Sequence, residues 1–189
     1  MYNKNLNAIY ITGLSASGKT TLAYKLISAM RTNAYNIMLL DGTELYNQSI
    51  LYPFKGHDIQ DRKDRASHHI RMVKWISSQS ILPIVAFIGQ PLSIRNGWSD
   101  ELDDWKEIYL KCDIKTCIRR DNKSLYSSNQ INKTASIIGI DNNFDEPINP
   151  WLTINTSICS EDEVKNIAWQ KIKSIDWLHK YKLENNSTP

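Results

Sequence analysis

The stretch that decides the fold of this chain reads Gly13-Leu14-Ser15-Ala16-Ser17-Gly18-Lys19-Thr20. It matches the pattern G-x-x-x-x-G-K-[ST], in which a glycine-rich loop binds phosphate groups. The β-branched and aromatic run at 8–12 is typical of a buried parallel strand. Beyond the loop, apolar residues recur at helical spacing over 20–27. A strand, a glycine-rich loop and a helix in this order predict a P-loop unit.

The residue types of the loop predict its chemistry. Gly13 and Gly18 can adopt backbone dihedrals that are closed to other residues, so the loop can surround a ligand with inward-pointing amides. These amides and the N-terminus of the following helix both attract a polyphosphate. We expect Lys19 to reach the β- and γ-phosphates and the Thr20 hydroxyl to bind Mg²⁺. The alternative is a glycine-rich turn that binds no ligand.

The composition is that of an ordinary globular domain. The 189 residues are 41% hydrophobic and 23% charged, and the net charge of +3, with no basic block, predicts no nucleic-acid partner. The three cysteines include no C-x-x-C pair, which argues against a disulfide framework or a zinc ribbon and favours a reducing cytosol. No stretch approaches 18 apolar residues and the N-terminus has no signal-type segment, so we expect a cytoplasmic protein without a membrane span.

Strands and helices alternate along the rest of the chain. The expected strands are 36–40, 82–88, 108–110 and 151–154, and the expected helices are 60–80, 114–120 and one that runs from a capping box at 160–163 through Leu178. This alternation predicts an α/β fold, a P-loop NTPase three-layer sandwich with a mainly parallel five-stranded sheet and helices on both faces. One domain is expected over 1–181, with a lid over the polar stretch 121–146 and a disordered tail at 182–189.

The order of the motifs resembles that of the adenylylsulfate kinase (APS kinase) family, P-loop enzymes that phosphorylate the ribose 3′-hydroxyl of adenosine 5′-phosphosulfate (APS). The matching stretches run in unbroken order over most of the chain. They are GLSASGKTTLA at 13–23, LLDG at 39–42, DR at 61–62, EIYLKC at 107–112, C-x-x-RD-x-K-x-LY at 117–126, GID at 139–141, EP at 146–147 and NT at 155–156. The resemblance implies ATP and Mg²⁺ as cofactors and a homodimer.

The resemblance also implies roles for single residues. Asp41 corresponds to a catalytic aspartate that accepts the proton of the acceptor hydroxyl or holds Mg²⁺ through water, while Lys19 stabilises the transferring phosphoryl group. The alternative for Asp41 is a helix-capping or turn residue before Gly42. The implied ATP-binding residues are Gly13, Leu14, Ser15, Ala16, Ser17, Gly18, Lys19, Thr20, Thr21, Arg120, Asp121 and Thr156, and Mg²⁺ is expected at Thr20.

Departures from the family pattern gather on the acceptor side. Tyr46 replaces an arginine, His57 replaces a Phe that stacks on adenine, and Arg65 replaces an Asn. A second aromatic clamp is lost at Ile137-Ile138, so adenine stacking worth about 1–3 kcal/mol per contact is removed. Arg62 matches the arginine that binds the anionic group of the substrate in the family. Without the family match, we would expect Arg62 to be a solvated helix residue. The implied acceptor-binding residues are Arg62, Arg65, His57, Tyr46, Arg95, Lys123, Ile137 and Ile138.

Three functions are compatible with this pattern. The first is a kinase for an anionic, nucleotide-linked small molecule, with APS as the family default. The second keeps the chemistry but acts on a cytidine-linked nucleotide such as cytidine diphosphoramidate, the substrate of some capsule-locus members of the wider family. The third is a non-catalytic ATP-binding partner protein, against which the intact Lys19, Thr20 and Asp41 argue.

Overall fold

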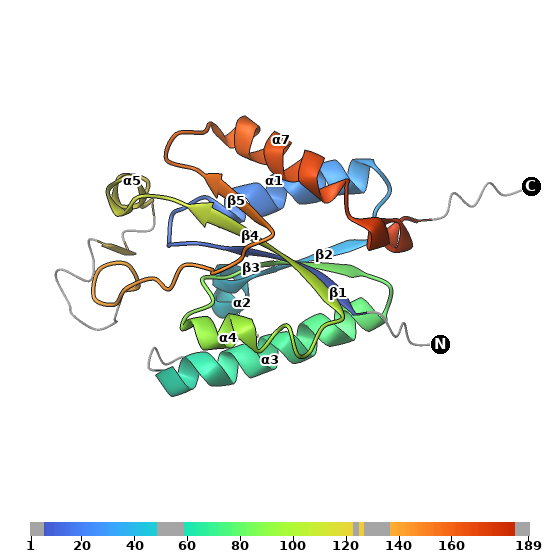
Figure 1. Ribbon diagram of the computed structural model, residues 1–189, viewed down its shortest axis with the longest axis horizontal. Helices are drawn as coiled ribbons and strands as arrows, with labels where there is room; N and C mark the ends of the chain where they lie inside the picture. Colours follow the sequence, from blue (N-terminus) through green and yellow to red (C-terminus); the bar gives the residue numbers. More distant parts are fainter. Residues whose placement is uncertain (1–5, 49–58, 123–124, 127–136, 184–189) are drawn as a thin grey trace, which may run out of the picture.

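A five-stranded sheet forms the centre of the computed structural model, which describes residues 6–48, 59–122, 125–126 and 137–183 (Figure 1). The strands stand in the order β2-β3-β1-β4-β5, and every pairing between neighbours is parallel. In chain order they are β1 (Asn7–Thr12), β2 (Ile37–Asp41), β3 (Leu82–Ala86), β4 (Asp104–Lys111) and β5 (Leu152–Asn155).

The central strand, β1, is buried along its whole length. Its side chains alternate between the two faces of the sheet. Ile9 and Ile11 pack into one apolar cluster with α1 (Lys19–Thr32) and α7 (Glu161–Ile172). Ala8 and Tyr10 pack into a second cluster with α3 (Ile59–Ser78). Figure 1 shows α1 and α7 above the sheet and α2 (Gly42–Asn47), α3 and α4 (Leu92–Asn96) below it. The expected three-layer α/β fold is thus confirmed.

The fourth strand is longer than its apolar core at 108–110 predicted. Asp104 to Glu107 also pair with β1, although three of these four side chains are charged. Contacts within the fold hold them, since Asp104 accepts a hydrogen bond from Trp177 Nε1 (2.6 Å) and Glu107 forms an ion pair with Arg95. Hydrophobic pattern alone misses such a strand end, because its stability depends on partners distant in sequence.

The last helix ends earlier than expected. The capping box is present at Ser160 and Glu163, but α7 stops at Ile172, and a 3₁₀ helix, η1 (Asp176–Tyr181), follows. Ile175 and Leu178 are buried all the same, because the chain turns and returns them to the core. The chain then continues in contact with the fold, since Leu183 N donates to Ala34 O. Contact with the domain therefore extends two residues into the predicted tail.

The ends of β1, β2 and β3 meet at one edge of the sheet. In parallel sheets, ligands bind beyond the carboxyl ends of the strands, at the point where the strand order reverses. Here the chain runs from β1 to β2 and β3 on one side, then crosses to β4 on the other. The glycine loop leaves β1 at this point. No helix in the described part of the chain is long and apolar enough to cross a membrane.

The opposite end of the fold is held by a buried tyrosine. Tyr181 in η1 is 1% exposed, and its hydroxyl lies 3.1 Å from Ser77 Oγ in α3 and 3.2 Å from Asn7 Oδ1 in β1. The backbone N–H of Asn7 in turn donates to Ser77 Oγ at 2.9 Å. These bonds connect the C-terminal segment, a helix of one layer and the central strand.

We predict that Tyr181→Phe destabilises the protein by about 1–3 kcal/mol, because two buried polar groups lose a hydrogen-bond partner. Urea unfolding measures the change. Tyr24→Phe is the matched control, since Tyr24 is 54% exposed, and it should stay within about 0.5 kcal/mol of wild type. Equal losses in both variants would contradict the role of the Tyr181 network.

Candidate active site

The phosphate-binding loop has the backbone that its glycines predict. Gly13 and Gly18 have φ angles of 146° and 99°, which L side chains rarely adopt. A Cβ at Gly13 would also lie 2.6 Å from the carbonyl oxygen of Leu110, so no larger residue fits. Neighbouring elements hold the loop from outside: Thr156 donates to Ser17 O (3.0 Å), and the Tyr126 hydroxyl donates to Ser15 O (2.9 Å). The residues present thus fit a nucleotide phosphate.

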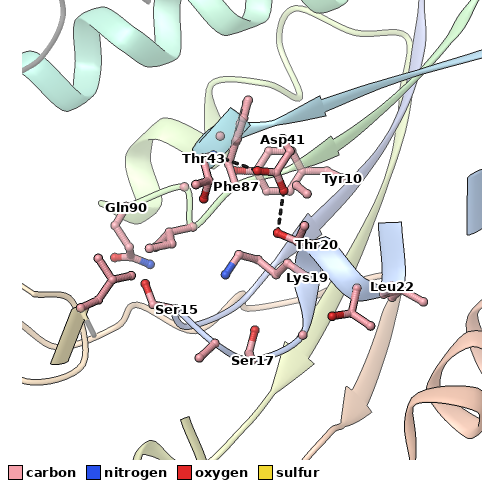
Figure 2. A pocket seen from close by; sticks show the side chains of 18 of the residues that line it. Tyr10, Ser15, Ser17, Lys19, Thr20, Leu22, Asp41, Thr43, Phe87 and Gln90 are labelled. Atoms are coloured by element: carbon pink, nitrogen blue, oxygen red, sulfur yellow. Dashed lines mark hydrogen bonds between the residues drawn. The ribbon is translucent and has the colours of Figure 1, made fainter. Parts of the chain in front are cut away.

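The side chain of Lys19 lies over the phosphate-binding loop. Its Nζ donates to Gly13 O at 2.9 Å and to Leu14 O at 2.6 Å, which places the ammonium group above the turn (Figure 2). A cation held there adds to the positive end of α1, where the first amides of the helix have no intrahelical acceptor. Both features favour an anionic ligand in the loop.

Asp41 uses its two carboxylate oxygens for different tasks. Oδ1 accepts from the backbone N–H groups of Thr43 (2.9 Å) and Glu44 (3.1 Å), and so caps α2. Oδ2 accepts from the Thr20 hydroxyl at 2.7 Å, across the space between β2 and α1 (Figure 2). The helix-capping alternative is therefore real, but it occupies only one oxygen. The Thr20–Asp41 pair brings two oxygen ligands together, the chemistry that Mg²⁺ prefers.

A cavity of about 1220 Å³ lies over these residues. Ligand sites for one drug-sized molecule usually measure about 300–1000 Å³, so this cavity is larger than a typical site for a single small ligand. It is lined by the loop and Asp41, by Tyr46 of α2, by residues of α3 and of the segment after β3, and by Arg120, Asp121, Thr156 and the start of α7. The structure therefore brings predicted ATP-side and acceptor-side residues into one continuous space.

One face of α3 lines the acceptor side of the cavity. Arg62, Arg65 and His69 recur at helical spacing and all contact this space. Burial and the neighbouring Arg65 lower the pKa of Arg62. The two side chains bring two guanidinium groups to this part of the cavity. His69 stacks on Phe87, with ring centroids 4.0 Å apart. Burial, with His68 and Arg65 nearby, lowers the pKa of His69 to about 3, so its ring is neutral at physiological pH.

Phe87, His69 and Gln90 were not among the predicted site residues. Phe87 belongs to the expected strand 82–88 and Gln90 follows it, but β3 ends at Ala86 and both residues face the cavity (Figure 2). The position of this segment at the carboxyl end of a central strand was the available signal.

Arg120 and Asp121 hold the ATP side of the cavity together. Arg120 Nη2 donates to the carbonyl of Thr156 at 2.9 Å, which connects the end of α5 (Ile114–Arg119) to the end of β5. Asp121 Oδ2 accepts from the backbone N–H of Tyr126 at 2.7 Å. Through Tyr126 and Thr156, both residues are joined to the phosphate-binding loop.

Some predicted acceptor residues lie elsewhere. Ile137 and Ile138 belong to the segment that packs beside Leu14 and Ile114, under the phosphate-binding loop, and do not line the cavity. Arg95 is 1% exposed and donates to backbone carbonyls, so its expected direct contact with an acceptor does not fit its position. A sequence match identifies the residue type but not the direction of its side chain. His57, Lys123 and the middle of the expected lid lie outside the described residues.

The chain is similar to adenylyl-sulfate kinases and to a cytidine diphosphoramidate kinase over most of its length. The family model for adenylylsulphate kinase matches residues 6–155. A probable adenylyl-sulfate kinase of Pyrococcus abyssi is 30% identical over 170 residues, which cover 90% of this chain and 97% of that protein. The cytidine diphosphoramidate kinase of Campylobacter jejuni subsp. jejuni serotype O:2 is 33% identical over 157 residues, which cover 83% of this chain and 90% of that protein.

Solved structures show the same fold. The APS kinase of Mycobacterium tuberculosis, in complex with AMPPNP and APS, superposes with a TM-score of 0.80 at 23% identity, over 91% of this chain and 100% of that one. The glycine loop, the Asp41–Thr20 pair and the family match over most of the sequence agree, and the chain therefore belongs to the adenylylsulfate kinase family of ATP-dependent phosphotransferases.

Proposed function

We propose that this enzyme transfers the γ-phosphate of ATP to a hydroxyl group of an anionic, nucleotide-linked small molecule other than APS. The observation that supports this most directly is the position of Asp41. Its carboxylate bonds to Thr20 of the phosphate-binding loop and lines the same cavity as Arg62 and Arg65. A base beside the phosphate loop and cations for an anionic acceptor thus share one space.

Each residue of the site has a chemical task in this proposal. Asp41 accepts the proton of the acceptor hydroxyl as the new oxygen–phosphorus bond forms and the bond from the γ-phosphorus to ADP breaks, so that ADP leaves. Lys19 stabilises the negative charge on the transferring group. The Thr20 hydroxyl would hold Mg²⁺, which would neutralise phosphate charge when bound. Arg62 and Arg65 orient the acceptor through its anionic group, because a guanidinium pairs with phosphate-like oxygens in a defined geometry.

The acceptor side supports a substrate different from APS. Tyr46 and Arg65 line the cavity, where the family pattern has an arginine and an amide, and His57 replaces a stacking Phe of that pattern. The similarity to a cytidine diphosphoramidate kinase, at 33% identity, makes that nucleotide the candidate to test first. The homodimer and the cytoplasmic location predicted from the sequence are part of the same proposal.

Substitutions at Asp41 and Lys19 should separate their roles. Asp41→Asn keeps a good helix cap but removes the base, so kcat should fall on the order of 10²–10⁴-fold with little change in the KM for ATP. Lys19→Ala should lower kcat and also weaken ATP binding.

The matched control is Asp113→Asn, because Asp113 caps α5 by accepting from Thr116 N at 2.8 Å and does not line the cavity. Its kcat should equal that of wild type. Near-wild-type kcat for Asp41→Asn with the acceptor that the enzyme uses would show that Asp41 is not the base.

Arg65→Asn, which returns the residue of the family pattern, should raise the KM for the acceptor. A hydrogen bond to a charged group is worth about 1.5–3 kcal/mol, which corresponds to about a ten- to hundredfold change. Steady-state kinetics at saturating ATP measure it, with the exposed Arg71 of α3 changed to Asn as control. A KM that moves equally in both variants would remove Arg65 from the acceptor site.

Parallel assays with APS and cytidine diphosphoramidate should distinguish the two acceptors. We expect kcat/KM for APS to be lower by about tenfold or more, because the stacking contact of about 1–3 kcal/mol that the family pattern has at position 57 is missing. A kcat/KM for APS at or above about 10⁶ M⁻¹s⁻¹ would instead identify an ordinary APS kinase.

A further inference from the structure

The buried side chain of Arg95 connects two segments of the chain near the active site. Arg95 of α4 forms an ion pair with Glu107 of β4, with Nε and Oε1 3.0 Å apart and side-chain exposures of 1% and 12%. Its Nη1 donates to the carbonyl of Gly89 at 2.7 Å, and its Nη2 donates to the carbonyl of Asp145 at 2.6 Å. The guanidinium therefore joins the segment after β3 to a segment more than fifty residues later.

A second set of contacts joins the same two segments. The side-chain amide of Gln90 donates to Asp145 O (3.0 Å) and accepts from Asp145 N (3.2 Å), as a neighbouring backbone strand would. Asp145 Oδ2 also accepts from Leu92 N at 3.0 Å. Phe144 covers Arg95, whose Cζ lies 5.6 Å from the ring centroid, and stacks on Tyr109 of β4. Segment 144–145 is thus fixed to the loop that carries Gly89 and Gln90.

Gly89 and Gln90 line the cavity, whereas Arg95 does not. Gly89 has a φ of 64°, and a Cβ there would meet the Tyr10 hydroxyl and the stem of Arg95. The loop conformation therefore depends on close packing against Arg95. Gln90 is 5% exposed, and its amide group is held by Asp145 rather than free to rotate. Any displacement of Arg95 moves this wall of the cavity.

We propose that Arg95 is a positioning residue, which sets the Gly89–Gln90 wall of the acceptor site by joining it to segment 144–145. This role rests on the proposed function in one respect, that the wall faces the acceptor. Arginine suits the task because its planar group offers several fixed directions: here it donates to two carbonyls and forms an ion pair with a carboxylate. Lysine has one nitrogen at the end of a flexible stem and would not span all three.

Burial explains why Glu107 accompanies Arg95. A buried guanidinium without a counter-charge would be strongly destabilising. Burial raises the pKa of Glu107, and Arg95 opposes that rise, so the pair is held as a unit. A variant that lacks only Arg95 or only Glu107 would therefore lose stability as well as function, and its kinetics would not separate the two effects. Replacement of both by apolar residues of similar length removes the charge problem and leaves only the loss of the carbonyl contacts.

The experiment is the double variant Arg95→Met/Glu107→Met in the full-length protein. We expect it to fold, with thermal unfolding close to that of wild type. We expect the KM for the acceptor to rise by about tenfold or more, because small misplacements of a binding wall are costly, while the KM for ATP stays within about twofold. Hydrogen exchange should become faster in peptides that contain Leu92 and Asp145. Arg95→Lys with Glu107 intact should not restore the acceptor KM.

Lys74→Met is the control, since Lys74 also forms an ion pair, with Glu101, but outside the cavity. Wild-type acceptor KM with unchanged exchange in the double variant would overturn the proposal. So would a loss of stability that raises both KM values together. The exchange measurement needs no acceptor. If wild type phosphorylates neither tested nucleotide, the proposed function fails, while faster exchange confined to these peptides still supports the role of Arg95.

Discussion

The burial of β1 on both faces is the constraint on which the rest of this structure depends. A strand with no solvent-facing side must be covered by helices above and below and paired on both edges. All six residues of β1 are buried, and β3 and β4 pair with it in parallel. The loop that follows β1 then emerges at the middle of the carboxyl edge. Gly13, pressed against the backbone of β4, shows how tightly the phosphate site is built into this sheet.

Two groups of elements reach the site from opposite faces of the sheet. Elements on the side of α1 and α7 hold the phosphate loop, through Thr156, Tyr126 and Arg120. Elements on the side of α3 and α4 line the part of the cavity where we propose that the acceptor binds, through Arg62, Arg65 and the segment after β3. Asp41 stands between them, with one oxygen on α2 and one on Thr20. The residues proposed to bind the acceptor thus belong to different elements from those that hold the phosphate loop. The residues of the acceptor side can therefore change while the phosphate loop is retained.

Some parts of this architecture could be predicted from sequence and others could not. Strands with continuous apolar runs, such as β1 and β3, and the Ser160 capping box carry their signal locally, and they were found. The polar half of β4 and the break after Ile172 carry none, since they depend on Trp177, Arg95 and the packing of η1. Arg95 itself shows the limit most clearly: its residue type suggested an anion contact, but its surroundings direct it to two carbonyls and a buried carboxylate.

The sequence by itself determined the phosphate-binding loop, the alternation of strands and helices, the family, and the replacement of residues on the acceptor side. These follow from local composition and from spacing along the chain, which a linear pattern contains. Only the tertiary structure decided that Asp41 both caps a helix and bonds to Thr20, that His69 and Phe87 stack in the cavity, and that Arg95 joins the segment after β3 to segment 144–145. These side-chain arrangements depend on distances and directions between residues far apart in sequence. Only the folded chain fixes those distances and directions.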